Sequence, residues 1–208
     1  AYALTAKAFD LAERFRCPVF LLTDKELATT LATVDLDAYP QVAVRSRATG
    51  EGGPPYRFDP VDVVTPLHEF GRGTTVRFTG STHDEAGFIT KHLPTVDALN
   101  RHLIEKIEAH RAEIEMVSAD LEDDATTLVL GYGITGGAVR AAVATARSRG
   151  ERFSGLVLQT LWPVPETALA SALTGVERVI VPELNPGLYR REIERIAGGR
   201  TVIGVERL

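Results

Sequence analysis

The densest group of titratable side chains is His83-Asp84-Glu85, with His92 nine residues after the first histidine. Glycines on both sides of this group predict a loop. Histidine and carboxylate side chains are common metal ligands and proton carriers, so the loop could bind a metal, a substrate or a neighbouring subunit. A hydrogen-bonded loop without chemical function explains the same residues. Residues 83–85 have the H-x-E spacing of zinc deaminases, but the Pro-Cys-x-x-Cys motif that completes the zinc site of those enzymes is absent from this sequence. We therefore assign no metal to the chain.

A glycine-rich turn is the second candidate, because residues 131–136 read G-Y-G-I-T-G between a predicted strand and a predicted helix. Backbone N–H groups at the start of such a helix could bind a phosphate. The dinucleotide-binding version also needs an acidic residue at the end of the next strand, and residues 159–161, Q-T-L, supply none. Two interpretations stay open: a nucleotide site, or glycines at Gly131, Gly133 and Gly136 that permit a tight turn and close helix packing.

Asn185 is the third candidate, within residues 183–187 that read E-L-N-P-G beyond a predicted parallel strand. Ligands of parallel sheets usually bind at the carboxyl ends of the strands, although a role as helix cap also explains this asparagine. Residues 162–165, W-P-V-P, follow another strand and could form an interface ridge or fix a turn. No G-x-S-x-G or Walker lysine loop is present, so we assign no catalytic residue to this chain.

Composition excludes several classes of function. The chain has 208 residues, with 23 Lys plus Arg and 28 Asp plus Glu, and a net charge of −5. No Lys/Arg run exceeds two residues, which argues against nucleic acid or an anionic membrane as partner. The single cysteine, Cys17, cannot form a disulfide within the chain or hold an iron-sulfur cluster. No apolar run reaches the roughly 18 to 20 residues that span a bilayer, so we expect a cytoplasmic protein.

The first half of the chain predicts few regular elements. Apolar spacing predicts a helix over residues 4–15, and the apolar run 19–22 predicts a buried strand of a sheet whose other elements are missing. Residues from 35 to about 77 predict an irregular linker rich in proline and glycine. A helix with Thr95 as N-cap is predicted over residues 96–115.

The second half alternates between strands and helices, which predicts a parallel, three-layer α/β domain. The predicted strands are 126–130, 156–161, 176–181 and 201–205, and the predicted helices are 135–149, 165–173 and a helix from Asn185-Pro186 to Ala197. The acidic residues 120–124 predict a boundary before this domain. We therefore divide the chain into residues 1–35, 36–124 and 125–208.

Several segments resemble the alpha chains of thiamine diphosphate-dependent 2-oxoacid:ferredoxin oxidoreductases. Residues 8–13 and 17–24 are similar to the end of their pyrimidine-binding α/β domain, and residues 79–87, T-G-S-T-H-D-E-A-G, resemble the family segment T-G-x-x-H-D-E-x-G. Three further segments resemble the transketolase C-terminal-like domain of these chains: L-G-Y-G at 130–133, L-x-P-x-P at 161–165 and V-I-V-P-E-L-N-P-G at 179–187. The family usually continues with glutamine, where this chain has Leu188.

This resemblance implies oxidative decarboxylation of a 2-oxoacid to an acyl-CoA, with two electrons passed through iron-sulfur clusters to ferredoxin. It implies that thiamine diphosphate, Mg²⁺ and the clusters belong to the beta subunit or other chains, with CoA as co-substrate. The chain is then the C-terminal part of an alpha subunit, which needs the N-terminal part and the beta subunit and is inactive alone. The H-D-E-x-G loop favours 2-oxoglutarate as the substrate.

Two other functions remain open on the sequence. The beta chain of a 2-oxoacid dehydrogenase E1 component has a similar C-terminal domain, although the loop at 83–87 favours the ferredoxin-linked family. A nucleotide-binding regulatory module would use residues 131–136. We also expect residues 125–208 to carry most of the fold of the isolated chain, while the elements before Asp24 need the rest of their domain.

Overall fold

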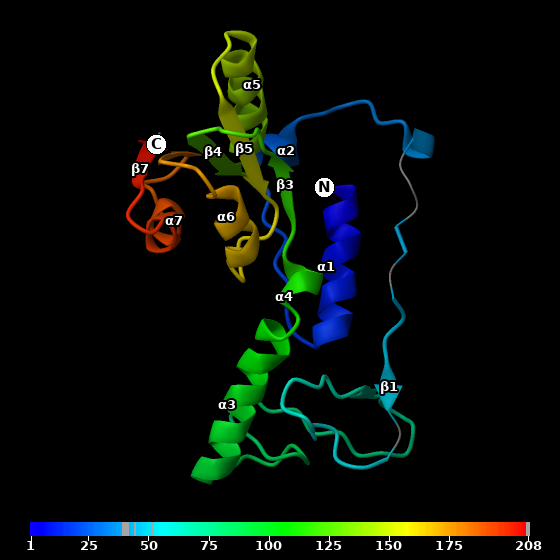
Figure 1. Cartoon of the computed structure of the whole chain (residues 1–208). Coiled ribbons are helices and arrows are strands. Elements are labelled where there is room, and N and C mark those ends of the chain that lie inside the picture. The colour runs from blue at the N-terminus through cyan, green and yellow to red at the C-terminus, as the bar shows by residue number, and fades with distance from the viewer. Residues whose placement is uncertain (39–41, 44, 51, 207–208) are drawn as a thin grey trace. The chain divides into compact units, whose positions relative to one another are not determined.

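The computed structural model describes all residues except 39–41, 44, 51 and 207–208, so parts of the predicted linker and the two C-terminal residues lie outside the described residues. The chain divides into two compact units (Figure 1). Unit 1 comprises Ala1–Leu22 and Ala32–Arg111, and unit 2 comprises Thr23–Leu31 and Ala112–Leu208. Among the described residues, no helix has both the length and the apolar character that crossing a membrane requires.

The regular elements of unit 1 are mainly helical. Helix α1, Tyr2–Phe15, buries Leu11 and Phe15 and ends at Arg16, which adopts the left-handed conformation. Helix α3, Leu93–Glu108, begins earlier than predicted, and His92 rather than Thr95 precedes it. The predicted helix 96–115 is also interrupted after Glu108, and a separate helix α4 covers Arg111–Ile114, which belongs to unit 2 from Ala112 onward.

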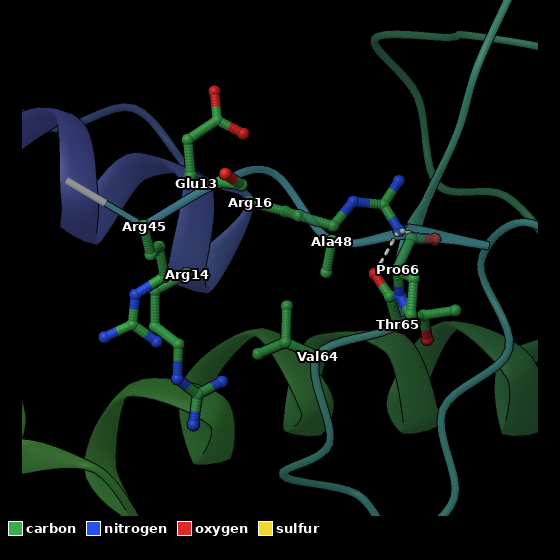
Figure 2. A pocket seen from close by; sticks show the side chains of 9 residues that line it. Glu13, Arg14, Arg16, Arg45, Ala48, Val64, Thr65 and Pro66 are labelled. Carbon is green, nitrogen blue, oxygen red and sulfur yellow. Dashed lines mark hydrogen bonds between the residues drawn. The ribbon is translucent and has the colours of Figure 1, made fainter.

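The segment between these helices is irregular and is held by side-chain contacts with the backbone. It contains the 3-10 helix η1, Leu36–Ala38, and two short parallel strands, β1 Thr49–Gly50 and β2 Leu67–His68. The Arg16 Nη1 group donates hydrogen bonds to the carbonyl oxygens of Pro55, Thr65 and Pro66, at 3.2, 2.7 and 3.4 Å. Figure 2 shows Arg16 beside Thr65 and Pro66. One guanidinium group therefore fixes two turns of this segment to the end of α1.

The prediction of a buried strand at residues 19–22 is wrong. In the described part of the chain these residues pair with no strand, and the side chains of Phe20 and Leu22 are 83% and 74% exposed. Four successive apolar residues form a strand only where neighbouring strands accept their backbone hydrogen bonds. Among the described residues no such neighbour is present.

Unit 2 contains the central sheet, whose strand order is β3-β5-β4-β6-β7. Its elements are α2 Lys25–Thr29, β3 Val117–Asp120, β4 Thr127–Tyr132, α5 Thr135–Ser148, β5 Phe153–Leu158, α6 Glu166–Ala172, β6 Arg178–Glu183, α7 Arg190–Ile196 and β7 Thr201–Glu206. Four strands are parallel, and the edge strand β3 runs antiparallel to β5. The predicted α/β class with a mostly parallel sheet is confirmed.

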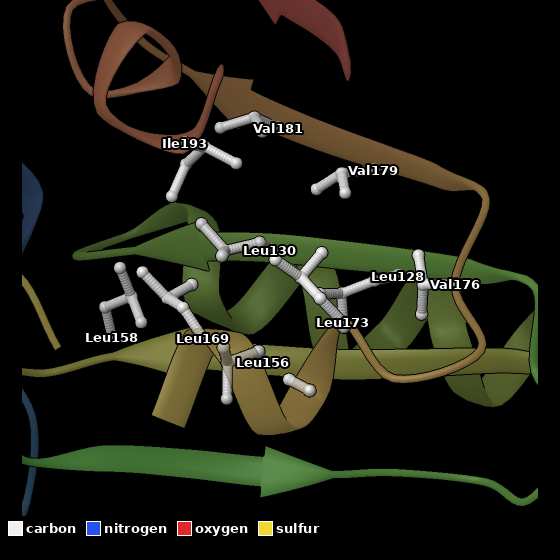
Figure 3. Packing of buried hydrophobic residues seen from close by; sticks show 11 residues of the cluster. Leu128, Leu130, Leu156, Leu158, Leu169, Leu173, Val176, Val179, Val181 and Ile193 are labelled. Carbon is white, nitrogen blue, oxygen red and sulfur yellow. The ribbon is translucent and has the colours of Figure 1, made fainter. Parts of the chain in front are cut away.

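Alternation of apolar residues along the strands creates two cores. Leu128 and Leu130 of β4 face α6 and α7, where Leu169 and Ile193 complete a cluster of eleven buried residues (Figure 3). Val129 of β4 points to the opposite face and packs with the buried valines of α5. Because successive strand side chains point to opposite faces, β4 is buried on both sides and sits at the centre of three layers.

Candidate functional site

The His83-Asp84-Glu85 loop of unit 1 is held together by its own hydrogen bonds. Asp84 Oδ1 accepts hydrogen bonds from the backbone N–H groups of Ala86 and Phe88, both at 2.9 Å. The His83 Nδ1 atom lies 2.8 Å from the Asp84 carbonyl oxygen. Its ring packs on Tyr56, with the ring centroids 4.4 Å apart. Asp84 therefore shapes the turn, and His83 is oriented by a hydrogen bond and a ring contact.

Glu85 forms an ion pair at the surface of the same loop. The Arg57 Nε atom donates to Glu85 Oε2 at 3.0 Å, and this hydrogen bond lowers the pKa of Glu85 below its usual value. His92 instead contacts the Thr95 hydroxyl, at 2.9 Å. In the part of the chain that the structure describes, no three His, Cys, Asp or Glu side chains converge as metal ligands. The loop thus exposes the Glu85 carboxylate, whereas the His83 ring is half-buried against Tyr56.

Replacing Glu85 with glutamine is expected to leave thermal unfolding of the chain unchanged. The Glu85 and Arg57 side chains are 51% and 61% exposed, and ion pairs at such exposure contribute little to stability. If the loop contacts substrate or a subunit, the same variant lowers the activity of the assembled enzyme. Glu69→Gln is the matched control, because Glu69 also pairs with an exposed arginine, Arg72, at 2.9 Å. Equal activities of the two variants would remove the loop from consideration as a contact site.

The glycine-rich turn of unit 2 already holds a carboxylate from the same chain. The Ile134 backbone N–H donates a hydrogen bond to Asp24 Oδ2 at 2.7 Å, at the start of α5. Gly133 has a φ of +54°, and a Cβ atom there would lie 2.8 Å from the same Asp24 oxygen. The Asp24 carboxylate therefore occupies the place where a bound phosphate would meet the helix.

The other two glycines of the turn permit close packing. A Cβ atom on Gly131 would lie 2.8 Å from the side chains of Thr135 and Val139. A Cβ atom on Gly136 would lie 2.7 Å from Val157 Cγ1 on β5. Close packing explains both glycines without a ligand, in line with the interpretation that they permit a tight turn and close helix packing.

Replacing Asp24 with alanine is expected to release residues 23–31 from unit 2. The substitution removes the acceptor of the Ile134 N–H group and a negative charge at a helix start, together worth about 0.5–2 kcal/mol. Hydrogen exchange of the α2 amides measures the loss of protection. Glu26→Ala changes an exposed carboxylate in the same short helix and is the control. Equal protection in both variants would show that the Asp24 contact does not hold the segment.

A buried carboxylate lies at the carboxyl ends of β4 and β6. Glu183 is only 2% exposed, and its Oε1 atom accepts hydrogen bonds from the Tyr132 hydroxyl at 2.7 Å and the Tyr189 backbone N–H at 3.0 Å. Its Oε2 atom accepts from the Arg190 backbone N–H, also at 3.0 Å. The carboxylate thus satisfies two backbone N–H groups at the beginning of α7. Within residues 183–187 the sequence favours Asn185 as the site residue. The only sequence signal for Glu183 is an acidic residue at the end of an apolar strand.

Asn185 joins this network and does not cap α7 as predicted. Its Nδ2 group donates to the Tyr132 hydroxyl oxygen at 2.9 Å, and its Oδ1 atom accepts from the Leu188 backbone N–H at 2.8 Å. The helix begins later, at Arg190. The correction has a simple physical reason: Glu183 supplies the acceptor at the helix start, and Asn185 closes the turn before it.

The two tyrosines of the network are neutral donors. Burial, reinforced by the Glu183 hydrogen bond, raises the pKa of Tyr132 to about 12. Burial also raises the pKa of Tyr189, whose hydroxyl donates to the Leu161 carbonyl oxygen at 3.2 Å. The network fixes the loops after β4, β5 and β6 at the carboxyl ends of these strands.

These loops expose large apolar side chains. Ile134, Trp162, Leu184 and Leu188 are 42%, 72%, 62% and 59% exposed, although they follow strands whose own side chains are buried. Leu188 is the residue that stands where the resembled family has glutamine. Exposed apolar residues gathered in this way are typical of surfaces that contact another protein.

Comparisons with known proteins agree in pointing to one family. Residues 125–207 match the family described as "Pyruvate:ferredoxin oxidoreductase core domain II". The chain is 34% identical over 203 residues to 2-oxoglutarate synthase subunit KorA of Methanothermobacter thermautotrophicus, covering 95% of this chain and 53% of the relative. It is 30% identical over 211 residues to ketoisovalerate oxidoreductase subunit VorB of the same organism, covering 99% of this chain and 51% of the relative.

A solved structure has the same fold. It is described as "2-oxoglutarate:ferredoxin oxidoreductase from Magnetococcus marinus with 2-oxoglutarate, coenzyme A and succinyl-CoA bound", and it matches with a TM-score of 0.84 at 22% identity. The match covers 99% of this chain and 36% of that chain. The chain spans about half the length of the curated relatives it matches. Residues 125–207 match that family's domain, and nearly the whole chain is similar to part of subunits of 2-oxoacid:ferredoxin oxidoreductases.

Proposed function

We propose that this chain is part of the alpha subunit of an enzyme that converts a 2-oxoacid and CoA to an acyl-CoA and CO₂, with two electrons passed to ferredoxin. The observation that carries the proposal is 34% identity to a 2-oxoglutarate synthase subunit over 203 residues, 95% of the chain. Three such subunits, from different methanogens, match at 32–34% identity. We therefore propose 2-oxoglutarate as the substrate, and a branched 2-oxoacid, in view of the VorB relatives, as the second candidate.

The cofactors of the proposed reaction belong to other chains. The sequence has one cysteine, too few for an iron-sulfur cluster, and the described residues present no group of three metal-ligand side chains. These residues do not fit Mg²⁺ or a cluster, and we assign no step of the reaction to this chain through either group. Thiamine diphosphate, Mg²⁺ and the clusters are accordingly proposed on the beta subunit and its partners.

The chain's own contribution in this proposal is to complete an assembly. The exposed apolar side chains beyond β4, β5 and β6 are candidates for contact with the beta subunit or with the other half of the alpha subunit. The exposed run 19–22 is a second such candidate, because apolar residues of this size are rarely left in water without a partner. Within the same proposal the chain works in the cytoplasm, and neither nucleic acid nor a membrane is a partner.

Purification from the native source tests the assembly. The chain is isolated by affinity capture, and the captured material is assayed for iron and thiamine and analysed by mass spectrometry of intact proteins. We expect a second protein with bound iron and thiamine diphosphate. Capture of the chain alone, free of iron and thiamine, would speak for an excised domain or a binding module. A thermal shift assay with NAD and ATP would then test the nucleotide-binding alternative.

A further inference from the structure

The sheet of unit 2 ends in a strand whose outer edge is open. Among the described residues β7 pairs with β6 alone, in an unbroken register through all six residues (Figure 1). Its sequence, T-V-I-G-V-E, contains no lysine or proline, the residues that often protect an edge strand from other strands. The opposite edge strand, β3, has four residues and ends in Asp120, which pairs with Arg147 at 2.7 Å. Of the two edges, β7 is therefore the one open to pairing.

The backbone groups that point outward from β7 follow from its pairing with β6. The Thr201 N–H donates to the carbonyl oxygen of Glu177, just before β6, at 3.1 Å. Because the backbone groups of successive strand residues point to opposite sides, those of Val202, Gly204 and Glu206 point away from β6. Within the described chain, no hydrogen bond to these outward groups is found. The edge therefore offers the N–H and C=O groups of alternate residues to another strand.

The side chains along this edge are apolar in the middle of the strand. Ile203 and Val205 are 40% and 47% exposed. They point to the sheet face opposite to Val202, which packs against the core cluster beside α6 and α7. β-Branched residues of this kind favour strand pairing. Charged residues stand at the two ends of this apolar stretch, Arg200 before the strand and Glu206 at its end.

We propose that the β7 edge binds the β7 edge of a second copy of this chain, in antiparallel orientation about a two-fold axis at Ile203. A two-fold contact requires a surface that is complementary to itself. In this register Val202 of each copy lies opposite Gly204 of the other, and each such pair exchanges two backbone hydrogen bonds. A shift by one residue is excluded, because it would place outward groups opposite inward ones. The surface lies in unit 2 and does not depend on the proposed function.

Charge complementarity selects this register and favours a second copy as the partner. Arg200 of each copy lies opposite Glu206 of the other, so that each end of the paired strands carries two opposite charges. The Arg200 guanidinium donates to the carbonyl oxygens of Val176 and Ala197, and no carboxylate of the described chain pairs with it. Glu206 lies 3.3 Å from Arg190, and its side chain remains 35% exposed. A shift of two residues in either direction would separate Arg200 from Glu206.

Sedimentation equilibrium of the full chain over a dilution series tests the proposal. Because the paired edge is short, we expect a weak dimer with a dissociation constant of about 10–100 µM. Ile203→Lys places two like charges opposite each other at the axis and is expected to raise this constant about tenfold or more. Ala119→Lys adds a lysine at an exposed position of the other edge strand and should leave the dimer unchanged. A monomeric unchanged chain above this range, or equal constants for the two variants, would overturn the proposal.

Disulfide formation tests the register without depending on the lysine variant. In a chain that also carries Cys17→Ser, Ile203→Cys places two thiols at the axis, where opposite Cα atoms are about 4.5 Å apart, a distance that a disulfide spans. We expect cross-linked dimers under mild oxidation. Val205→Cys is the control, because its two copies are separated by four residues along the strands, roughly 13 Å. No cross-link with Ile203→Cys, or equal cross-linking of both variants, would contradict the pairing.

Discussion

Replacing Glu183 with alanine is expected to lower the free energy of unfolding of unit 2 by about 3–5 kcal/mol. The substitution leaves the buried N–H groups of Tyr189 and Arg190 and the Tyr132 hydroxyl without their acceptor. It also opens a cavity where a side chain 98% buried had stood. Urea unfolding followed by far-UV circular dichroism measures the change.

Two further variants show whether the hydrogen bonds cause the loss. Glu183→Gln keeps the shape and one carbonyl acceptor, so we expect a smaller loss of about 1–2 kcal/mol. Glu177→Ala removes an exposed glutamate just before the same strand and is expected to change stability by less than about 0.5 kcal/mol. If Glu183→Ala were as stable as Glu177→Ala, the buried network would not organise this edge of the sheet.

Replacing Gly136 with alanine is expected to destabilise unit 2 by about 1–3 kcal/mol. The new methyl group would lie 2.7 Å from Val157 Cγ1, so α5 must move away from β5. The helix propensity of alanine opposes this loss by roughly 1 kcal/mol, and the overlap outweighs it because Val157 is buried in a packed core. Thermal and urea unfolding measure the net effect.

The adjacent glycine provides the control for this substitution. A Cβ atom on Gly137 would meet no atom within 4 Å, and the residue lies in the same turn of α5. Gly137→Ala is therefore expected to stabilise the protein by about 0.5–1 kcal/mol. Opposite signs for neighbouring Gly→Ala changes would assign Gly136 to helix packing. Equal stabilisation by both would contradict the close approach of α5 to β5.

The elements that could be predicted from sequence are those whose burial leaves a periodic trace. Strand β4 has apolar residues on both faces, and α5 has an alanine-rich face with a glycine turn before it, so both were predicted within two residues of their limits. Strand β3 was missed because V-S-A-D at a half-exposed edge has no apolar run. The strand prediction for residues 19–22 was wrong for the opposite reason: their apolar run indicates a strand, but the described chain does not contain the neighbouring strands.

The candidate sites differ in the same way: those that rest on a local pattern could be predicted from sequence, and those that join distant residues could not. A strand-turn-helix pattern is local, so the turn at residues 131–136 could be predicted, but only the structure favours packing over a nucleotide site at Gly131 and Gly136. The Asp24 carboxylate at Ile134 joins residues 110 positions apart, and no local pattern reports such a contact. The family resemblance adds the reaction class, which residue chemistry alone did not provide.

Electron transfer by the assembled enzyme that contains this chain tests the proposed function. Ferredoxin reduction is followed with 2-oxoglutarate, pyruvate or 2-oxoisovalerate, each with and without CoA, and the acyl-CoA product is identified by mass spectrometry. We expect CoA-dependent reduction of ferredoxin, fastest with 2-oxoglutarate, and no reduction by the isolated chain. An assembly that contains this chain, iron and thiamine diphosphate and yet reduces ferredoxin with none of the three acids would contradict the proposed function.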